Sequence, residues 1–379
     1  MATAHLFKAL GSPLYEGIRD AETARLEMLG IAQAWPFFSK SGTSEDDIYS
    51  QDVRTALPQF QPGTRTSAGT ATETNMTATI PLTFVIPSYG RQQKLERAVA
   101  SILAQGVLPE EIIVVDDASP EPLVLPEAVA ATGRVRLIRQ PVNGGAAQAR
   151  NTGMEAARTD WVSFLDSDDW LLPDTLQPRW HFLQEGEDRT AEKGRTVYGC
   201  GWQDTLPDGT VLRERVPLPA HGPVDFFRGC WFSPGSCIIL NRQEVLRLAG
   251  GADGSLRRLE DYEWFVRIGL AGFVLKVQDM AGAGIERGSN TSLAAVSAAA
   301  DAISLRIAGL TRDRQDKAVL RRRANAYLRY ERAASAWREK RLAAFALLMA
   351  GSLAASPRLK LSPLPGWTLR HAPAPRVRP

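Results

Sequence analysis

The feature that most constrains the fold is a series of short runs, rich in apolar and β-branched residues, separated by segments with helical spacing. The runs are LTFVI (82–86), EIIVV (111–115), RVRLI (134–138) and WVSFL (161–165). They lack the polar alternation of a half-exposed strand, so we expect them to be buried on both faces. Apolar residues at helical spacing over 92–104 and small residues over 145–158 predict the helices between them. The pattern predicts a parallel sheet covered by helices on both faces.

The second half of the chain has a less regular, α+β pattern. A DGT turn between two apolar segments is typical of a hairpin, and Gly250–Gly251 is typical of a helix end. The predicted elements are a hairpin at 196–203 and 211–215, a strand at 237–241, and helices at 242–249 and 260–270.

Cysteine and histidine content argues against two common kinds of site. Cys200, Cys230 and Cys237 are the only cysteines, an odd and sparse set that rules out a disulfide scaffold and contains no CxxC pair for zinc. Four histidines argue against a histidine-rich metal centre. The chain also lacks GxGxxG after the first strand and has no GxxxxGK[ST] loop. Neither a dinucleotide site nor a P-loop is therefore predicted.

Charge is distributed unevenly along the chain. Residues 301–379 hold 17 Lys/Arg and 5 Asp/Glu, a net charge of +12, whereas the rest of the chain carries −9. We expect a weakly helical or disordered extension at 1–78, a basic helical extension at 301–356 and a disordered, Pro-rich tail at 357–379. Met76, separated by five residues from the first predicted strand, is a candidate for an alternative start of translation. The basic region predicts either contact with an anionic partner such as lipid headgroups or an ordinary solvated helical face.

Polar residues follow each of the four predicted strands of the first half. These are Ser88–Tyr89, Asp116–Asp117, Asn143–Gly144–Gly145 and Asp166–Ser167–Asp168–Asp169. Because ligands of open α/β sheets bind outside the carboxyl ends of the strands, we expect all five carboxylates at one rim. Such a cluster needs a cation or hydrogen-bond donors among its members. Oxygen ligands favour Mg²⁺ or Mn²⁺, which typically also hold substrate phosphates. Taken alone, Asp116–Asp117 fits a turn or a helix cap equally well.

In this order, the motifs resemble the inverting glycosyltransferases of family 2, which have the GT-A fold. The resemblance covers about residues 80–290 and is carried by FVIPSYGR, IIVVDDAS, NGGAAQARNTG, FLDSDDWLLP, GSCIILNRQEVLRLAGG and LEDYEWFVRIGLAG. It implies an α/β fold: a GT-A-type, nucleotide-binding mixed sheet flanked by helices, with a C-terminal helical extension. The implied domain spans 79–300, with a nucleotide-sugar half at 79–170 and an acceptor half at 171–300.

The resemblance also implies roles on the donor side. Pro87 and Tyr89 match positions that border the nucleotide base, and Asp117 matches the aspartate that hydrogen-bonds the base. Asp166 and Asp168 match the DxD motif. In that motif the first carboxylate lies near the ribose and the second binds the divalent metal, here Mn²⁺ or Mg²⁺.

On the acceptor side, Glu260–Asp261 match the ED motif, in which the aspartate is the catalytic base. Transfer with inversion needs a group that takes the proton of the attacking hydroxyl, and a carboxylate can do so. From the residues alone, acids favoured by the dipole at a helix N-terminus would be the preferred explanation of this pair. Arg150 matches an arginine near the nucleotide, and Asp169, Glu260 and Arg287 are further site candidates.

The implied activity is metal-dependent transfer of a sugar from a nucleotide-diphosphate sugar to an acceptor hydroxyl, in cell-surface polysaccharide or glycoconjugate synthesis. The acceptor would be a saccharide or lipid-linked saccharide, and nucleic acid is not an expected partner. The alternative is a catalytically silent nucleotide-sugar-binding or scaffold protein, against which intact Asp168 and Asp261 argue. A sugar-1-phosphate nucleotidyltransferase is a third interpretation, but PSYGR stands where its GxGTR-type loop would be.

Several features depart from the family pattern. GGADGSL replaces the GGFDE of many relatives, and Arg287 lies where relatives often have a histidine. The absence of a QxxRW motif argues against a processive synthase. Trp202, Trp231 and Phe232 are candidates for stacking on a sugar, although core burial is the ordinary role of such residues.

The C-terminal region combines an Arg/Lys-dense stretch at 317–342 with the apolar stretch 342–354, which is too short to cross a bilayer at about 1.5 Å per residue. The leading interpretation is a helical pair packed against the catalytic domain. The alternative is an anchor in the interface of an anionic membrane. The expected location is the cytoplasm, with or without peripheral contact at the inner face of the membrane.

Overall fold

A ten-stranded mixed sheet forms the centre of the computed structural model, with the path β10-β7-β6-β8-β4-β1-β2-β3 and with β9 paired to β5 and β6. The strands are β1 (Thr79–Ser88), β2 (Leu108–Asp116), β3 (Val135–Arg139), β4 (Trp161–Phe164), β5 (Trp170–Leu171), β6 (Thr196–Thr205), β7 (Val211–Pro217), β8 (Ile238–Asn241), β9 (Val274–Glu286) and β10 (Trp367–Arg370).

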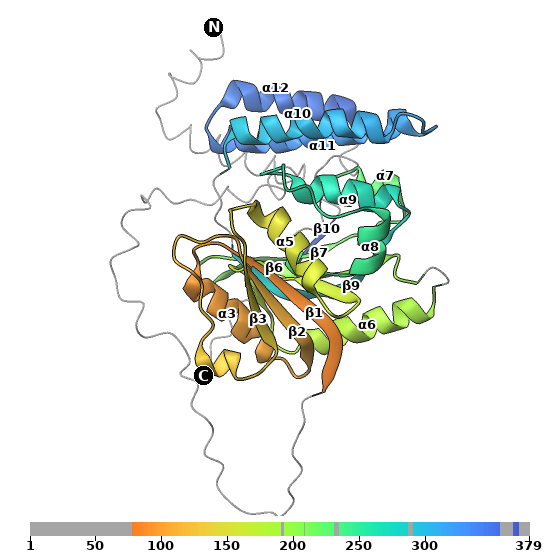
Figure 1. The fold of residues 1–379 in the computed structure, drawn as a ribbon. Coiled ribbons are helices and arrows are strands. Elements are labelled where there is room, and N and C mark those ends of the chain that lie inside the picture. The colour runs from red at the N-terminus through yellow and green to blue at the C-terminus, as the bar shows by residue number, and fades with distance from the viewer. Residues whose placement is uncertain are drawn as a thin grey trace, which may run out of the picture. The chain divides into compact units, whose positions relative to one another are not determined.

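Helices cover this sheet and continue beyond it (Figure 1). They are α3 (Gln92–Leu103), α4 (Glu127–Ala130), α5 (Gly145–Ala156), α6 (Leu176–Asp188), α7 (Pro223–Phe226), α8 (Arg242–Leu248), α9 (Glu260–Leu270), α10 (Leu293–Leu310), α11 (Lys317–Arg338) and α12 (Leu342–Ala355). A 3₁₀ turn, η2, spans Gly235–Cys237.

The structure describes residues 78–190, 193–207, 209–230, 235–286, 291–356 and 367–370. Residues Met76–Pro379 form one compact unit. The predictions for the extension before residue 78, and those for Trp231, Phe232 and Arg287, lie outside the described residues.

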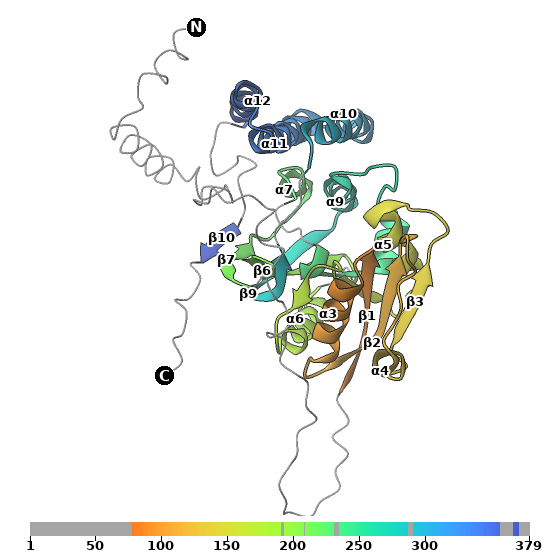
Figure 2. The ribbon, with the colours of Figure 1, turned by 90° about the vertical axis from the view of Figure 1, so that its left-hand side faces the viewer.

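The predicted parallel half is confirmed. Strand β1 pairs in parallel with β2 on one side and with β4 on the other, and β3 extends the sheet from β2. Helices α3 and α5 lie on different sides of β1 (Figure 2). Alternate residues of β1 face them, because Val85 clusters with residues of α5 and Phe84 clusters with residues of α3. Burial on both faces explains why β1, β2 and β4 show no polar alternation. The expectation of burial on both faces is wrong for β3, because it is the edge strand of the sheet and only Val135 is buried there. Helix α5 lies so close that a Cβ on Gly153 would come within 2.2 Å of the Val85 side chain.

The second half of the chain adds antiparallel strands to the sheet. Strand β8 pairs antiparallel with β4, and β6 and β7 form the predicted hairpin. The sequence analysis did not anticipate β9, which runs parallel to β6 and carries β5 at its other edge. Polar residues interrupt the apolar pattern of β9, and its pairing with β6 joins segments far apart in the chain, so local sequence gives little sign of it.

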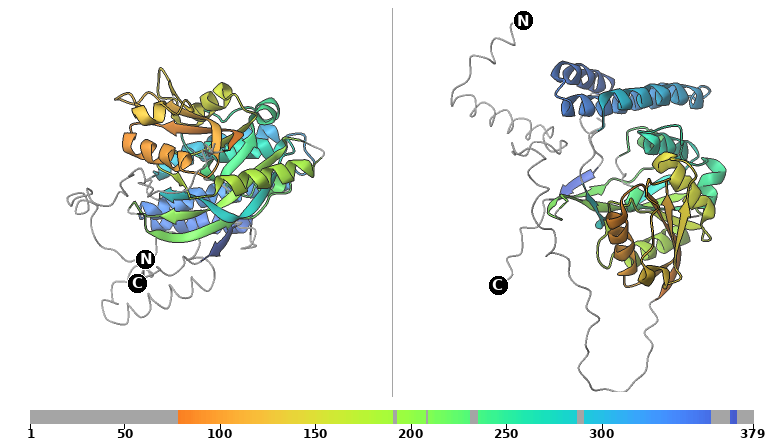
Figure 3. Two further views of the ribbon diagram at one scale, coloured as in Figure 1. Left: turned by 90° about the horizontal axis from the view of Figure 1, so that it is seen from below. Right: turned by 60° about the vertical axis from the view of Figure 1, so that its left-hand side comes forward.

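The C-terminal extension is helical, as predicted, and α10, α11 and α12 lie together beyond α7 and α9 (Figures 2 and 3). Helices α10 and α11 share a buried cluster with α9 that includes Tyr262, Val266, Ile303 and Tyr327. Helix α12 packs on α11, where the Ser352 hydroxyl donates to the Ala326 carbonyl at 2.7 Å. The predicted packing of this region is thus confirmed for α11, while α12 reaches the domain through α11.

Two features of the extension differ from expectation. Helix α10 has 18 residues with a mean hydropathy of 1.5, and within the described ranges it alone is long and apolar enough to cross a membrane. Its buried face belongs to the cluster just described, as in the core helix of a globular domain. Strand β10 pairs antiparallel with β7, so the prediction of a disordered tail is wrong for Trp367–Arg370. These four residues lie between Pro-rich segments and contain no proline themselves.

Candidate active site

A cavity of about 410 Å³ lies at the carboxyl ends of β1, β2 and β4. We call it the rim pocket. Its lining includes Pro87, Tyr89, Arg91, Asp117, Arg150, Asp166, Asp168, Arg258 and Glu260. The structure therefore brings the predicted donor-side residues together, because parallel strands end at the same edge of a sheet.

The DxD loop after β4 is held by arginine side chains and by η2. Asp166 forms an ion pair with Arg150 at 2.7 Å, and Asp168 pairs with Arg91. The Ser236 hydroxyl accepts a hydrogen bond from the Asp166 backbone N–H at 3.1 Å and donates to the Asp169 carboxylate at 2.6 Å. Burial, with the charge of Asp166, raises the pKa of Asp169 well above its ordinary value. Asp169 is therefore a buried support of the loop and does not line the rim pocket.

Of the two adjacent aspartates at the end of β2, one supports the loop from beneath and the other lines the rim pocket. Asp116 is buried, pairs with Arg139 at 2.5 Å and accepts from the Ser119 backbone N–H at 2.9 Å. Burial raises its pKa, but the hydrogen bonds from Ser119 and its other partners outweigh this and lower it. Successive strand residues point to opposite faces, which takes Asp116 away from the rim. The prediction of five carboxylates at one rim is therefore wrong for Asp116 and Asp169.

Asp117 lines the rim pocket and at the same time anchors the start of α5. Its two carboxylate oxygens accept the backbone N–H groups of Gly144 and Gly145 at 2.7 and 2.8 Å. Gly145 has a φ of +82°, which favours glycine. The Asn-Gly-Gly segment is therefore a turn that receives Asp117, and the sequence analysis did not foresee this contact.

A second cavity, of about 500 Å³, opens beside the N-terminus of α9. We call it the α9 pocket. Asp261 lines it, whereas Arg150, Asp166, Arg258 and Glu260 line both pockets. Leu259, just before the ED motif, has a left-handed φ of +57°, a conformation that costs a leucine roughly 1–3 kcal/mol. The two pockets thus meet at a shared wall, with Asp261 on the far side from Asp168.

Arg150 supplies a buried positive charge at this wall. Burial lowers its pKa, but the charges of Asp166 and Glu260 outweigh this effect and raise it. Its Nη1 lies 3.8 Å from the Glu260 carboxylate. Burial and the charge of Asp261 raise the pKa of Glu260, while Arg150 opposes the shift. The guanidinium therefore remains charged and compensates the carboxylates around it.

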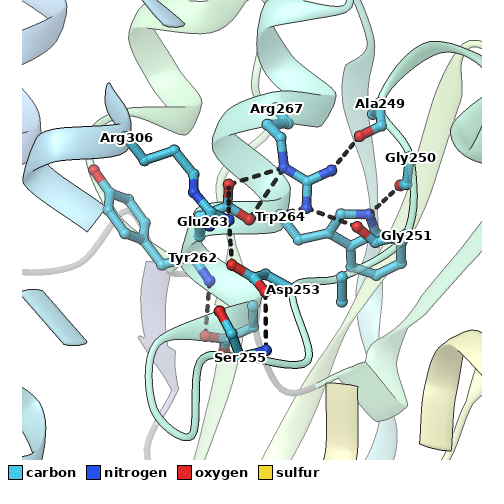
Figure 4. A network of polar contacts seen from close by, with 12 residues as sticks. Ala249, Gly250, Gly251, Asp253, Ser255, Tyr262, Glu263, Trp264, Arg267 and Arg306 are labelled. Carbon is cyan, nitrogen blue, oxygen red and sulfur yellow. Dashed lines mark hydrogen bonds and ion pairs between the residues drawn. The ribbon is translucent and has the colours of Figure 1, made fainter. Parts of the chain in front are cut away.

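Helix α9 is fixed behind the site by a polar network (Figure 4). The buried Glu263 carboxylate accepts from Arg267 at 2.8 Å and from Arg306 of α10 at 3.2 Å. Arg267 also donates to the Gly251 carbonyl at 2.7 Å, and Arg306 pairs with Asp253. The altered GGADGSL loop is thus tied to both α9 and α10.

Sequence reasoning missed several residues of the two pockets. Arg91 and Arg258 carry positive charge into the rim pocket, and Ser236 orders the DxD loop. Tyr327, Glu331 and Arg338 reach the α9 pocket from α11. Their positions depend on packing between distant segments, so no local motif marks them. Trp202 is a core residue, as expected, and its indole N–H donates a hydrogen bond to the Asp204 carboxylate at 2.9 Å. It also lines the α9 pocket.

The residues present suit a hard cation, although they offer few ligands. In the part of the chain that the structure describes, no group of three or more His, Cys, Asp or Glu side chains gathers as a metal site. Asp166 and Asp168 nevertheless line the rim pocket with oxygen ligands. Mg²⁺ and Mn²⁺ are commonly held by one or two carboxylates together with substrate phosphates and water. This donor set therefore fits such an ion in the presence of a diphosphate.

Comparison with known proteins agrees with this arrangement. Residues 83–243 match the sequence model of glycosyl transferase family 2. This segment of the chain therefore resembles glycosyl transferase family 2. The matched segment contains η2 and the loops after β1, β2 and β4, whereas Arg258, the ED motif and α10–α12 follow it.

Curated relatives match the chain over part of their length. An uncharacterized glycosyltransferase of Haemophilus influenzae is 25% identical over 187 residues, 49% of this chain and 61% of the relative. The succinoglycan biosynthesis protein ExoO of Rhizobium meliloti is 42% identical over 96 residues, 25% of this chain and 28% of the relative. The chain thus spans less than two thirds of the length of each of these relatives.

A solved structure confirms the fold. The crystal structure of S. aureus TarS 1-349 matches with a TM-score of 0.51 and 16% identity, covering 73% of this chain and 81% of that one. The expected α/β fold of the GT-A type, with a mixed sheet flanked by helices and a C-terminal helical region, is the fold observed.

Proposed function

We propose that this protein is a family 2 glycosyltransferase that transfers a sugar from a nucleotide-diphosphate sugar to an acceptor hydroxyl, with inversion at the anomeric carbon. The observation that carries the proposal is the junction of the two pockets. Arg150 and Glu260 line both, Asp168 lies on the rim side, and Asp261 lies on the α9 side. A donor in the rim pocket and an acceptor in the α9 pocket would meet at this wall.

The rim pocket offers what a nucleoside diphosphate requires. The Tyr89 side chain is 48% exposed and can stack on a base. Arg91, Arg150 and Arg258 bring positive charge toward a diphosphate. TarS structures were solved in complex with UDP and with UDP-GlcNAc. UDP is therefore the first nucleotide to test here. It is not assigned to this protein, because the likeness to TarS is one of fold.

Asp168, with Asp166 beside it, would hold Mn²⁺ or Mg²⁺ on the diphosphate. When bound, such a cation stabilises the negative charge that develops on the leaving nucleoside diphosphate. Asp168 pairs with Arg91 at the rim, so a bound cation would replace or share this partner.

Asp261 is proposed as the general base. The acceptor oxygen attacks the anomeric carbon while the bond to the diphosphate oxygen breaks, and the hydroxyl proton passes to the Asp261 carboxylate. Direct displacement from the opposite face inverts the configuration and needs no covalent enzyme intermediate. Asp261 accepts the Tyr262 backbone N–H at 2.7 Å, which helps to fix its orientation.

We further propose a role in cell-surface polysaccharide or glycoconjugate synthesis, with a saccharide or lipid-linked saccharide as acceptor. The relative ExoO supports this setting, since it is a succinoglycan biosynthesis protein. We place the protein in the cytoplasm, in peripheral contact with the inner face of the membrane. The apolar helix α12 supports that contact, because Leu342 and Leu347 are 61% and 77% exposed, and exposed arginines of α11 suit anionic headgroups.

The test is a screen of UDP, GDP, dTDP and CMP sugars, with and without Mn²⁺. Binding should raise the melting temperature by mass action, and turnover should release the free nucleotide. Binding without release of nucleotide, with every acceptor tried, would favour the alternative of a catalytically silent binding protein. Absence of both effects for all donors would contradict the proposal.

A further inference from the structure

Helix α11 forms part of the α9 pocket although it lies outside the segment that matches the family model. Tyr327, Glu331 and Arg338 of α11 line the same cavity as Asp261. The i, i+4 spacing of Tyr327 and Glu331 places both side chains on one face of the helix. A region that looked like a basic extension in the sequence therefore supplies one wall of the pocket that faces the proposed base.

Tyr327 is built into this wall. Its ring packs on the ring of Tyr262, the residue after the proposed base, with centroids 4.5 Å apart. On its other side it approaches Gly229 so closely that a Cβ there would lie 2.7 Å from a ring carbon. Gly229 also has a φ of +148°, so this close approach combines an absent side chain with a backbone that favours glycine.

Glu331 is the carboxylate that α11 adds to the pocket. Burial raises the pKa of Glu331, a hydrogen bond with Tyr327 lowers it, and the charge of Asp261 raises it. Glu331 and Asp261 both line the α9 pocket, so the two carboxylates face the same cavity. Hydroxyl groups can donate to both carboxylates, whereas an anionic group placed directly between them would be repelled. Arg338 also lines the pocket, so the glucuronide in the experiment below tests whether this arginine admits an acid.

We propose that Glu331 and Tyr327 form the acceptor subsite, and that it takes an uncharged sugar unit of which one hydroxyl attacks while a neighbouring hydroxyl donates to Glu331. The inference rests on the proposed function and names its acceptor class. Asp261 takes the proton of the attacking hydroxyl, and Glu331 holds the sugar without accepting a proton. Tyr327 orients Glu331 and closes the pocket behind it.

The experiment uses the full chain and the nucleotide sugar with the highest turnover in the donor screen. Release of nucleoside diphosphate is measured with water alone and with methyl glucoside, methyl galactoside, methyl N-acetylglucosaminide or methyl glucuronide. Glu331→Ala is compared with the wild type, with Glu331→Gln as the conservative variant and Tyr327→Phe as a second probe of the same wall. Asp301→Asn is the matched control, because Asp301 on α10 is 73% exposed and pairs with Arg332 away from the pocket.

We expect neutral glycosides to accelerate nucleotide release in the wild type. Glu331→Ala should raise the acceptor KM about 10- to 100-fold, as for loss of a hydrogen bond to a charged group. Donor KM should change far less than acceptor KM, and the acceptor KM of Glu331→Gln should lie between those of the wild type and Glu331→Ala. Tyr327→Phe should raise the acceptor KM less than Glu331→Ala, and Asp301→Asn should match the wild type.

Three results would overturn the subsite. They are an unchanged acceptor KM in both Glu331 variants, acceleration by the glucuronide alone, and no acceleration by any glycoside while donor turnover persists. A fall in donor affinity equal to the change in acceptor KM would also contradict it, because that is the signature of general structural damage. Loss of donor binding and of nucleotide release in the wild type would instead refute the proposed function, and the subsite with it.

Discussion

Replacement of Glu263 by glutamine tests how the active-site helix is held. The Glu263 side chain is wholly buried and accepts hydrogen bonds from Arg267 at 2.8, 2.9 and 3.1 Å. Glutamine preserves the shape but removes the charge. The Arg267 side chain, which is 17% exposed, would then be left without its carboxylate inside the domain.

The magnitude follows from the exposure of the two arginines. Loss of one member of a buried ion pair costs about 3–5 kcal/mol. Arg267 retains the carbonyls of Ala249 and Gly251, and Arg306 is 41% exposed and retains Asp253. Because both arginines keep these partners, we expect the free energy of unfolding to fall by the lower end of this range, about 3 kcal/mol. For a domain of this size, that corresponds to a fall in Tm of roughly 6–12 °C.

The assay is thermal unfolding followed by circular dichroism, with Asp301→Asn as control. The control removes one charge from an exposed pair and should lower Tm by no more than about 3 °C. If Glu263→Gln lowers Tm no more than Asp301→Asn does, the reasoning about this buried network is refuted. The variant should also have a higher acceptor KM than the wild type, because Asp261 and Tyr262 lie on the helix that the network fixes.

Four further predictions address the site and its surroundings. Asp168→Asn should abolish turnover with Tm nearly unchanged, and EDTA should inhibit the wild type until Mn²⁺ or Mg²⁺ is restored; full activity after exhaustive chelation would contradict the metal role. Asp261→Asn should lower kcat about 10²- to 10⁴-fold with donor affinity retained, and normal turnover with lost nucleotide binding would contradict the assignment. Because burial raises the pKa of Glu260, its stabilising contribution is present below its ordinary pKa of 4.5 and is lost as pH rises through the folded value. Glu260→Gln should therefore raise Tm at pH 7 but not at pH 4, and an equal effect at both pH values would contradict this. Sedimentation with anionic vesicles at low salt should decrease in Leu347→Glu, and a wild type that ignores such vesicles would refute the membrane contact.

The residues themselves were sufficient to predict the parallel half of the fold. Apolar β-branched runs without alternation identify strands covered on both faces, and Val85 and Phe84 face different helices, as that pattern requires. The same logic placed Asp117, Asp166 and Asp168 at one pocket, because the ends of parallel strands meet. The resemblance to family 2 came from the order of short motifs, each of which occupies a strand end or a helix start.

Tertiary structure alone decided which of these carboxylates are available to a ligand. Asp116 and Asp169 belong to the same motifs as Asp117 and Asp168, yet Arg139 and Ser236 hold them beneath the rim. A one-residue step along a strand or turn reverses the direction of a side chain, and a sequence motif does not report which direction its partners require.

Long-range packing decided the remaining features of the site. Strand β9 pairs with β6, and α11 brings Glu331 to the pocket of Asp261 although 69 intervening residues separate them in the chain. Charge and apolar content in the C-terminal region predicted helices from the sequence, because helix formation is governed by neighbours three and four residues apart. Which face of α11 would line a pocket depended on Tyr262 and Gly229, contacts that exist only after the chain has folded.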